Sequence, residues 1–337
     1  MRRICILPRV EGVGGVASFR LKLEAGLESR GVGVTHDPGE AVGSILVLGG
    51  TRGLLPLWRA KRRGARIVQR LDGINWIHRK RNTGPRHFVR AEYGNFMLSF
   101  IRRFLADRIV YQSEFARRWW ESRYGKTRVP SSVIHNGVDL EVYSAGRDTV
   151  PPHPPYKLLV VEGIFGGGFD MGLDNAVQLA DALQTKHGFP MELMVVGKID
   201  DAPRARVEAQ ARVPIRWLGL VPRERIPEID RSAHLLFSAD INAACPNSVI
   251  EALACGLPVV AFDTGALNEL VTGDAGRLVP YGGDVWKLEP PDVASLAEAA
   301  SEVLKDPQGF RRAARARAES ALGLDKMVEA YLSVLAE

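Results

Sequence analysis

The sequence predicts an α/β protein of two Rossmann-like domains, each built on a doubly wound parallel sheet. Short apolar runs alternate with helical patterns on both sides of one irregular segment. That segment, DTVPPHPPY at 148–156, has four prolines and no hydrophobic periodicity, which is typical of a stiff linker. We therefore expect an N-terminal domain over 1–150, a C-terminal domain over 151–320 facing it across a cleft, and a last helix at 321–337 that packs back on the first domain.

The first half has the strands of one such sheet. A helix is expected at Ala17–Ser29, another begins near Ser113, and a short strand precedes Asp37. The longer expected strands are Arg3–Leu7, Ser44–Leu48, Ala65–Gln69, Arg108–Tyr111 and Val133–Ile134. Ligands of open α/β sheets bind at the carboxyl ends of the strands, so the loops that follow these strands are the candidate binding segments.

The loop after the first strand is rich in glycine. Gly12, Gly14 and Gly15 lie in it, and Ala17 completes a G-x-G-x-x-A spacing. Together with Asp37, this pattern is typical of a dinucleotide-binding turn whose acid binds a ribose. A tight strand-to-helix turn also favours glycine without any ligand. We retain Gly14 and Gly15 as ligand-binding candidates.

The loop RLDGINWIHRKRNTG follows the Ala65–Gln69 strand. It supplies Asp72, Asn75, Trp76 and His78, which are the candidates of the first half for contact with a substrate. The alternative is an ordinary long surface loop in which these side chains serve packing and solubility.

The second half repeats the alternation. Its expected strands are Lys157–Val161, Glu192–Val196, Ile215–Leu218, Leu235–Ser238 and Val259–Phe262. Its expected helices are Asp174–Gln184, Pro203–Ala211, Asp292–Leu304, Phe310–Leu322 and the amphipathic Asp325–Ala336.

The segment 239–269 contains two helix starts beside one strand. Ser248 is expected to cap a helix that ends at Gly256, and Gly265 is expected to open the next helix. Helix N-termini present unpaired N–H groups and a partial positive charge. Two of them at one sheet edge predict a site for an anionic ligand such as a diphosphate.

Composition excludes several classes of protein. Hydrophobic residues make up 46% of the chain and charged residues 25%, as in a globular enzyme. No apolar run approaches the ~20 residues of a membrane span, and the N-terminal run is too short for a signal peptide. Cys5, Cys245 and Cys255 suit neither a disulfide framework nor a metal site, so we expect packed thiols and a cytoplasmic protein.

Charge is distributed unevenly. Residues 52–128 have 20 Lys or Arg against 5 Asp or Glu, a balance of +15, so the rest carries 6 − 15 = −9. A basic first half indicates an anionic partner such as a lipid head group or a phosphorylated acceptor. A solvated basic surface is the alternative. We expect no nucleic-acid partner, because the basic residues form no recognisable nucleic-acid motif.

Five ordered motifs resemble those of GT-B glycosyltransferases, in particular the retaining family-4 group. They are GGVASF, VIHNGVDLEVYS, LGLVPRERIPEIDRSAHLLFSAD, PNSVIEALACGLPVVAFDTGALNELV and LDKMVEAYLSVL. The resemblance covers nearly the whole chain. It implies a nucleotide-sugar donor held mainly by the second domain, a hydroxyl acceptor held mainly by the first, and no metal or other cofactor.

The resemblance also assigns residues. Glu251 matches the second Glu of the donor-binding signature and would bind the donor ribose, although Ser248 and Glu251 also form a capping box. The first Glu of that signature aligns with Ala243. The Arg and Lys that brace the diphosphate in the family align with Gly166 and Met171, and RLDG replaces the first-domain His of the family.

Other residues are expected to compensate for these departures. A backbone without side chains can aim N–H groups at a diphosphate, and Lys198 or Arg70 can supply a cation. Asp72, Asp240 and Asn242 are the catalytic candidates, the last two as replacements for the missing acid. The donor-binding candidates are Gly14, Gly15, Gly163, Gly166, Gly167, Gly168, Lys198, Asn247, Ser248 and Glu251.

The function expected from this reading is retaining, metal-independent sugar transfer to a hydroxyl of a glycan, a lipid-linked acceptor or a small molecule. A lipid-linked acceptor would place the protein peripherally on the inner face of an anionic membrane. The alternatives are a non-catalytic binding protein of transferase ancestry, a nucleotide-sugar epimerase, and a dinucleotide-dependent oxidoreductase, which would use the glycine turn with Asp37.

Overall fold

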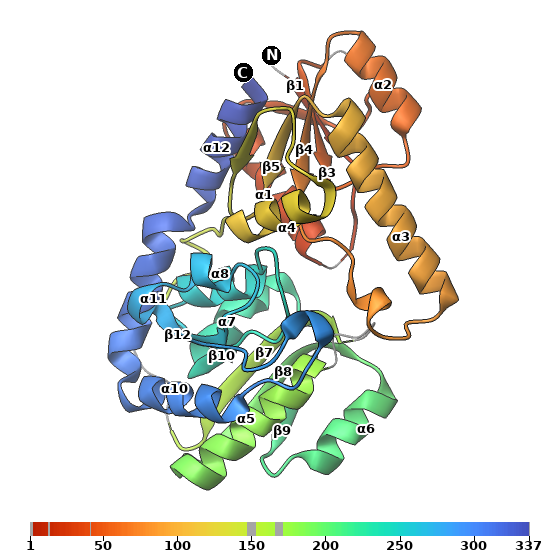
Figure 1. The fold of residues 1–337 in the computed structure, drawn as a ribbon. Coiled ribbons are helices and arrows are strands. Elements are labelled where there is room, and N and C mark those ends of the chain that lie inside the picture. Colours follow the sequence, from red (N-terminus) through yellow and green to blue (C-terminus); the bar gives the residue numbers. More distant parts are fainter. Residues whose placement is uncertain (1–2, 13, 41, 147–152, 166–170, 337) are drawn as a thin grey trace. The chain divides into compact units, whose positions relative to one another are not determined.

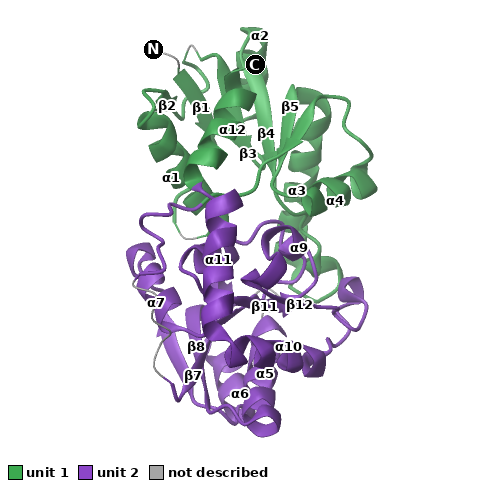
Figure 2. Ribbon diagram, turned by 90° about the vertical axis from the view of Figure 1, so that its left-hand side faces the viewer, with its two compact units in different colours: residues 1–137, 324–337 green, residues 138–323 purple. Residues whose placement is uncertain are grey.

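The structure of the protein is a computed structural model that describes residues 3–12, 14–40, 42–146, 153–165 and 171–336. The chain divides into two compact units (Figure 2). Unit 1 contains residues 1–137 and 324–337, and unit 2 contains residues 138–323. Each unit has its own six-stranded parallel sheet.

The sheet of unit 1 has the order β2-β1-β3-β4-β5-β6 (Figure 1). Its strands are β1 (Arg3–Leu7), β2 (Gly33–Thr35), β3 (Ser44–Leu48), β4 (Arg66–Leu71), β5 (Arg108–Tyr111) and β6 (Ser131–Val133). The central strands β3 and β4 are buried almost throughout, because helices cover both faces.

Helices α1 (Gly15–Glu28) and α12 (Leu324–Ala336) pack on one face of this sheet, where Phe19, Val328 and Tyr331 join its core. Helix α2 (Leu54–Arg62) and the π-helical turn η2 (Ile101–Leu105) contribute to the core of the other face. The remaining helical elements are η1 (Ile77–Arg79), α3 (Pro85–Phe100) and α4 (Glu114–Tyr124). The expected return of the last helix to the first domain is confirmed.

The sheet of unit 2 has the order β12-β11-β10-β7-β8-β9. Its strands are β7 (Tyr156–Phe165), β8 (Met191–Ile199), β9 (Ile215–Gly219), β10 (Leu235–Phe237), β11 (Val259–Phe262) and β12 (Gly276–Val279). The first strand of the unit therefore lies between the second and the fourth, and the strand order reverses there.

Helices cover both faces of this sheet as well. One face holds α5 (Met171–His187), α6 (Asp201–Gln210) and α10 (Val293–Lys305). The other holds α7 (Ile226–Ser232), α8 (Asn247–Ala254), α9 (Leu267–Leu270) and α11 (Pro307–Ala321). Short 3₁₀ turns lie at η3 (Arg223–Arg225), η4 (Gly273–Ala275) and η5 (Val285–Lys287).

The expected α/β class with two doubly wound parallel sheets is confirmed, and several boundaries differ. Ser113 caps α4, since its Oγ accepts from Ala116 N at 3.0 Å. The capping role expected of Ser248 is wrong. The N-cap of helix α8 lies two residues earlier, at Pro246, and the described residues provide no side-chain cap hydrogen bond there.

Candidate functional site

The carboxyl ends of β7 and β10 form the centre of the candidate site in unit 2. These strands are parallel neighbours, with Leu158 opposite Leu235 and Leu159 opposite Leu236. Strand β8 flanks β7 on its other side, so the connections that leave β7 and β10 lead to opposite sides of this point. Ligands of doubly wound sheets bind at such a reversal of strand order.

Two carboxyl groups meet at this edge. Glu162 lies near the end of β7, and Asp240 lies just beyond β10; both residues are half-buried. Desolvation, followed by the negative charge of Asp240, raises the pKa of Glu162. Desolvation also raises the pKa of Asp240. The pair therefore favours retaining a proton near neutral pH.

Glu162 is the functional candidate that the sequence reading missed. The family resemblance places the missing acid at Ala243, so Asp240 and Asn242 are the replacements expected from the sequence. The available signal was the position of Glu162 as the first acid after the first apolar run of the second domain, a position that parallel-sheet topology brings to the ligand edge.

Asn242 stands beside the carboxyl pair in a left-handed conformation, with φ at 58°. Such a conformation is uncommon for a residue other than glycine and clusters at functional sites. The side chain is buried, and within the described residues its Nδ2 has no hydrogen-bond partner. A buried amide without a partner is costly, so a ligand oxygen at this position would restore its hydrogen bond.

The loops after β10 and β11 hold this conformation in place. Ala266 N donates to Ala243 O at 2.9 Å. Gly265 has φ at 63°, and a Cβ there would lie 2.6 Å from Ala243 N. The close approach of the two loops therefore requires glycine, because any side chain would push the Asn242 loop away.

The N-terminus of α5 reaches the same edge. A Cβ on Gly172 would overlap the carbonyl oxygen of Ala239, so the first turn of α5 packs directly against the chain leaving β10. Helix α5 has 17 residues, and its first N–H groups can bind an anion here.

The other donor-side candidates lie at different distances from this centre. Gly163 is inside β7, next to a register shift with β8, instead of in the expected loop. Lys198 is exposed near the end of β8, opposite Ile164. Asn247 and Ser248 are half-buried in the first turn of α8. Gly166, Gly167 and Gly168 lie outside the described residues.

Glu251 is buried in α8. Burial and then the charge of Glu251 raise the pKa of Asp230 well above its usual range, and the same two causes raise the pKa of Tyr143. Glu251 therefore lies close to both groups. Burial also raises the pKa of Cys255 and of Cys5, which keeps these thiols protonated and unsuited to nucleophilic attack.

The glycine loop of unit 1 is fixed from within the unit. Gly14 precedes α1, with φ at 134°, and Gly15 is the first helical residue; both are exposed. Arg20 Nε donates to Val10 O at 3.0 Å. The Asp37 carboxylate accepts from Gly39 N at 2.7 Å, so it stabilises its own turn.

Arg70 and Asp72 lie at the end of β4. Arg70 is buried, donates to Asn136 Oδ1 at 2.8 Å and stacks its guanidinium 3.7 Å from the centre of the Phe19 ring. Burial raises the pKa of Asp72, and the Arg70 charge opposes that shift. The carbonyl oxygen of Asp72 accepts from the indole of Trp120 at 2.7 Å.

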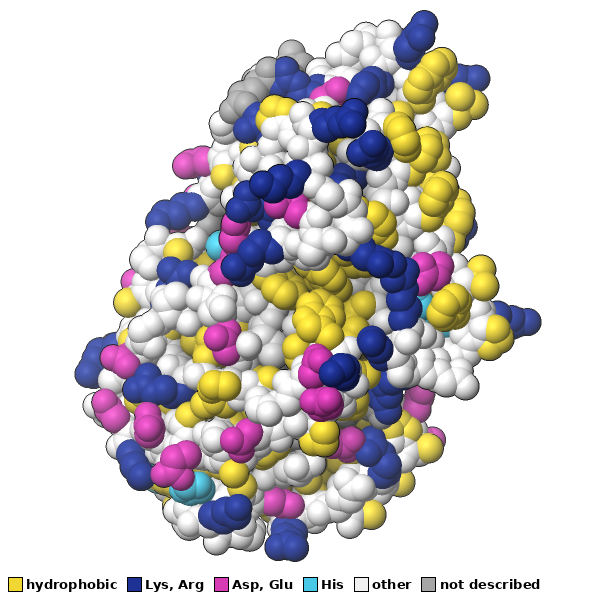
Figure 3. Space-filling view, viewed as in Figure 1, with side chains coloured by type: hydrophobic (Ala, Val, Ile, Leu, Met, Phe, Trp, Pro, Cys, Tyr) yellow, Lys and Arg dark blue, Asp and Glu magenta, His cyan; other side chains and the backbone are white. Residues whose placement is uncertain are grey.

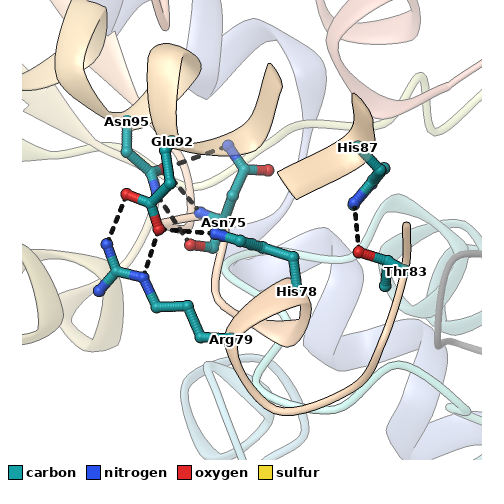
Figure 4. Close-up of polar contacts among 7 residues, drawn as sticks. All are labelled: Asn75, His78, Arg79, Thr83, His87, Glu92 and Asn95. Atoms are coloured by element: carbon teal, nitrogen blue, oxygen red, sulfur yellow. Dashed lines mark hydrogen bonds and ion pairs between the residues drawn. The ribbon is translucent and has the colours of Figure 1, made fainter. Parts of the chain in front are cut away.

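Two of the remaining first-domain candidates, Asn75 and His78, are hydrogen-bonded to α3 (Figure 4). His78 Nε2 lies 2.8 Å from Glu92 Oε1, and Arg79 forms a bidentate ion pair with the same carboxylate. These hydrogen bonds, that from Arg79 first, lower the pKa of Glu92 to about 2. Asn75 and Asn95 exchange hydrogen bonds at 2.9 to 3.2 Å. Trp76 is half-buried at the start of η1.

Two family descriptions match the chain in order. "Glycosyltransferase Family 4" matches residues 48–142, and "Glycosyl transferases group 1" matches residues 163–306, which include the β7–β10 edge and α8. The chain belongs to these GT-B glycosyltransferases. The expected family is thereby confirmed.

Curated relatives of this glycosyltransferase chain are similar over part of their length. The chain is 31% identical over 223 residues to a phosphatidyl-myo-inositol mannosyltransferase of Mycobacterium leprae, covering 65% of the chain and 55% of the relative. It is 31% identical over 229 residues to a GDP-mannose-dependent alpha-(1-6)-phosphatidylinositol dimannoside mannosyltransferase of Mycobacterium tuberculosis, covering 63% and 53%. The chain thus spans about half the length of the curated relatives it matches.

Solved structures support the GT-B fold of this glycosyltransferase. Sucrose-phosphate synthase of Thermosynechococcus elongatus matches with a TM-score of 0.73 at 17% identity, over 100% of both chains. Anabaena HepE, solved in complex with UDP and glucose, matches with a TM-score of 0.69 at 14% identity, again over 100% of both chains. Within the described residues, no helix is long and apolar enough to cross a membrane. The same residues contain no group of three His, Cys, Asp or Glu placed to hold a metal ion.

Proposed function

We propose that this protein transfers a sugar from a nucleotide-sugar donor to a hydroxyl acceptor, with retention at the anomeric carbon and without a metal. The observation that carries the proposal is the cluster of Glu162, Asp240 and Asn242 at the strand-order reversal of unit 2. The cluster lies at the ligand edge of the sheet. Asp240 and Asn242 are within residues 163–306, which the glycosyl transferases group 1 description matches, and Glu162 immediately precedes that range.

Each group of the cluster has a role that its environment supports. The protonated member of the carboxyl pair donates to one sugar oxygen while the ionised member accepts from a sugar hydroxyl. Asn242 Nδ2 donates to the sugar or to the diphosphate. Glu251 on the donor ribose is a role carried over from the family resemblance.

The chemical step follows from these contacts. The bond between the anomeric carbon and the phosphate oxygen breaks, and the acceptor oxygen bonds to the same face of that carbon. The acceptor proton passes to the departing phosphate oxygen. The N–H groups at the start of α5 stabilise the negative charge that develops on the diphosphate.

For the acceptor, we propose a hydroxyl group on a lipid-linked molecule at an anionic membrane surface. The relatives named above act on phosphatidylinositol or its mannosides by name. The balance of +15 over residues 52–128 gives unit 1 the charge to approach such a surface.

A non-catalytic donor-binding protein is the second candidate. One observation favours it: Ala243 stands where the family resemblance expects a glutamate, and Met171 stands where it expects a lysine that binds the diphosphate. Such a protein would bind the nucleotide-sugar donor without transferring the sugar. The oxidoreductase alternative gains no support, since the carboxylate of Asp37 accepts a hydrogen bond within its own turn.

The test is a thermal-shift screen against UDP-, GDP- and ADP-sugars, followed by a search for released nucleotide with the donor that stabilises the protein. Stabilisation by a nucleotide sugar with nucleotide release supports transfer. Stabilisation without release, across lipid-linked and soluble acceptors, supports the binding protein. No stabilisation by any of these donors contradicts both candidates.

A further inference from the structure

Helix α3 and the turn η2 carry an apolar stripe that lies largely outside the core of unit 1. Val89, Tyr93, Phe96, Phe100 and Phe104 recur at intervals of four, three, four and four residues, which places them on one face at about 100° per residue. Val89 is 67% exposed, Phe96 58% and Phe104 63%. We call these five residues the α3 stripe.

The stripe is not the main packing face of the helix, although Phe100 is half-buried against the core that contains Leu57 and Ile101. Ala91, Asn95 and Leu98 of α3 and Leu105 of η2 are buried against the unit. The contacts recorded within the stripe run along it, with ring centres 6.1 Å apart between Phe96 and Phe100 and 5.0 Å between Phe100 and Phe104. A contiguous exposed apolar surface of this kind is typical of an interaction site.

The charged residues beside the α3 stripe indicate what binds to it. Arg86, Arg90 and Arg103 are exposed and lie on both sides of the stripe. Glu92 is the single carboxylate in the sequence of residues 85–105, and it is neutralised by its ion pair with Arg79. An apolar face with cationic edges fits the boundary between anionic head groups and acyl chains.

Helix α2 extends this surface. It lies against η2 and exposes Leu55 and Trp58, with the guanidinium of Arg62 5.3 Å from the centre of the Trp58 ring. Figure 3 shows hydrophobic side chains following one another over α2 and α3 along the right-hand edge, with Lys and Arg side chains near them. Aromatic rings and long basic side chains both suit a membrane interface.

We propose that the α3 stripe, with Leu55 and Trp58, inserts into the interfacial layer of a bilayer that contains anionic lipid. The inference rests on the proposed function, because a lipid-linked acceptor is presented at that layer. It goes beyond charge attraction, since it requires apolar side chains to enter the membrane and therefore predicts binding that salt does not abolish.

The test uses flotation of the full chain with phosphatidylcholine vesicles that do or do not contain phosphatidylglycerol. The protein is expected to float with the anionic vesicles and to keep a measurable bound fraction at about 1 M salt, where the Debye length is about 3 Å. The double variant Phe96→Ser with Phe104→Ser should lose at least about tenfold in vesicle affinity and all of the salt-resistant fraction.

The matched control changes apolar residues of similar exposure in unit 2, with Val142→Ser and Leu220→Ser, which are 54% and 53% exposed in the parent chain. It should bind vesicles as the parent does. A fluorophore on Phe96→Cys should shift to the blue with vesicles, whereas one on Leu220→Cys should not. Labelling is selective, because the native thiols are buried.

Three results would overturn the inference. They are binding that 1 M salt abolishes, equal loss in the control pair, and a dimer whose mass falls to that of a monomer in the stripe variant, which would assign the stripe to a second copy of the chain. Donor-induced thermal shifts are measured on the same samples. A protein that binds donor but not vesicles contradicts this inference alone.

Discussion

The polar clusters at the two strand ends differ in how their hydrogen bonds are satisfied. In unit 1, the loop after β4 is bound to α3 through Glu92, whose carboxylate accepts two hydrogen bonds from Arg79 and lies 2.8 Å from His78 Nε2. In unit 2, Asn242 keeps a buried Nδ2 without a partner among the described residues, beside two carboxyl groups of raised pKa.

This difference separates structural polar groups from groups kept for a ligand. A network that satisfies itself gains nothing from a ligand and rigidifies its loop. A network with an unmet donor and a retained proton gains hydrogen bonds when a ligand arrives. From the sequence, Asp240 is expected to be catalytic and His78 to contact the acceptor, and their hydrogen-bond environments differ in the structure.

The largest expected effect concerns the carboxyl pair. Asp240→Asn and Glu162→Gln each remove the charge and the retained proton while keeping the shape, so the transfer rate should fall by about two orders of magnitude. Nucleotide release under saturating donor measures it. Asp201→Asn, at the exposed start of α6, is the control and should leave the rate unchanged. Rates equal to the parent would remove the pair from the mechanism.

The next effect concerns donor affinity. Asn242→Gly keeps the left-handed backbone and deletes the amide, so the donor Kd should rise about tenfold, or about 1.4 kcal/mol, with little change in melting temperature. Asn242→Ala deletes the same amide but strains the backbone, so it should also lower stability by about 1 kcal/mol. Calorimetric titration and denaturant unfolding measure the two. An unchanged Kd in both variants would show that the amide does not bind the donor.

A smaller effect is expected in unit 1. Glu92→Gln removes the ion pair with Arg79, so it should destabilise unit 1 at pH 7. The loss should be only about 1 kcal/mol, because the Glu92 side chain is a third exposed. The donor Kd should not change. The folded-state pKa of Glu92 is lowered from 4.5 to about 2, so its contribution is present above 4.5 and disappears as the pH falls toward 2. Urea unfolding of parent and variant across that range tests this. A difference that stays constant with pH would contradict the ion-pair explanation.

The smallest effect concerns the stability of unit 2. The pKa of Glu162 is raised in the folded state above its usual value of 4.5. As the pH rises above 4.5, the unfolded state ionises first, so the parent chain loses folding stability. Glu162→Gln should therefore gain stability relative to the parent between pH 5 and pH 9, by up to about 1 kcal/mol for this half-buried group. Asp201→Asn again serves as the control. A gain of the same size in the control would assign the effect to net charge.

The fold was accessible from the sequence because parallel-sheet strands are apolar runs bounded by turn residues. Arg3–Leu7, Ser44–Leu48 and Arg108–Tyr111 were located to the residue. Helix α3 was missed because its outer face is aromatic and its interior includes Gly94, so its pattern resembles neither an ordinary surface helix nor a strand.

The site was accessible only in part. Motif resemblance led to Asp240 and Glu251 through the spacing along the chain. It could not lead to Glu162, because the proximity of Glu162 to Asp240 depends on the pairing of β7 with β10, in which Leu158 and Leu235 are 235 − 158 = 77 positions apart. The contact between His78 and Glu92 could not be predicted either, because Glu92 lies on α3, which was not predicted from the sequence.

The position of α12 has a consequence for the order in which the protein is made. Val328 and Tyr331 complete the core of unit 1, yet they follow the whole of unit 2 in the chain. A ribosome therefore releases every residue of the continuous unit 2 before the last helix of unit 1 emerges. Unit 2 can fold during synthesis, whereas unit 1 must keep its α1 face open until α12 has been synthesised.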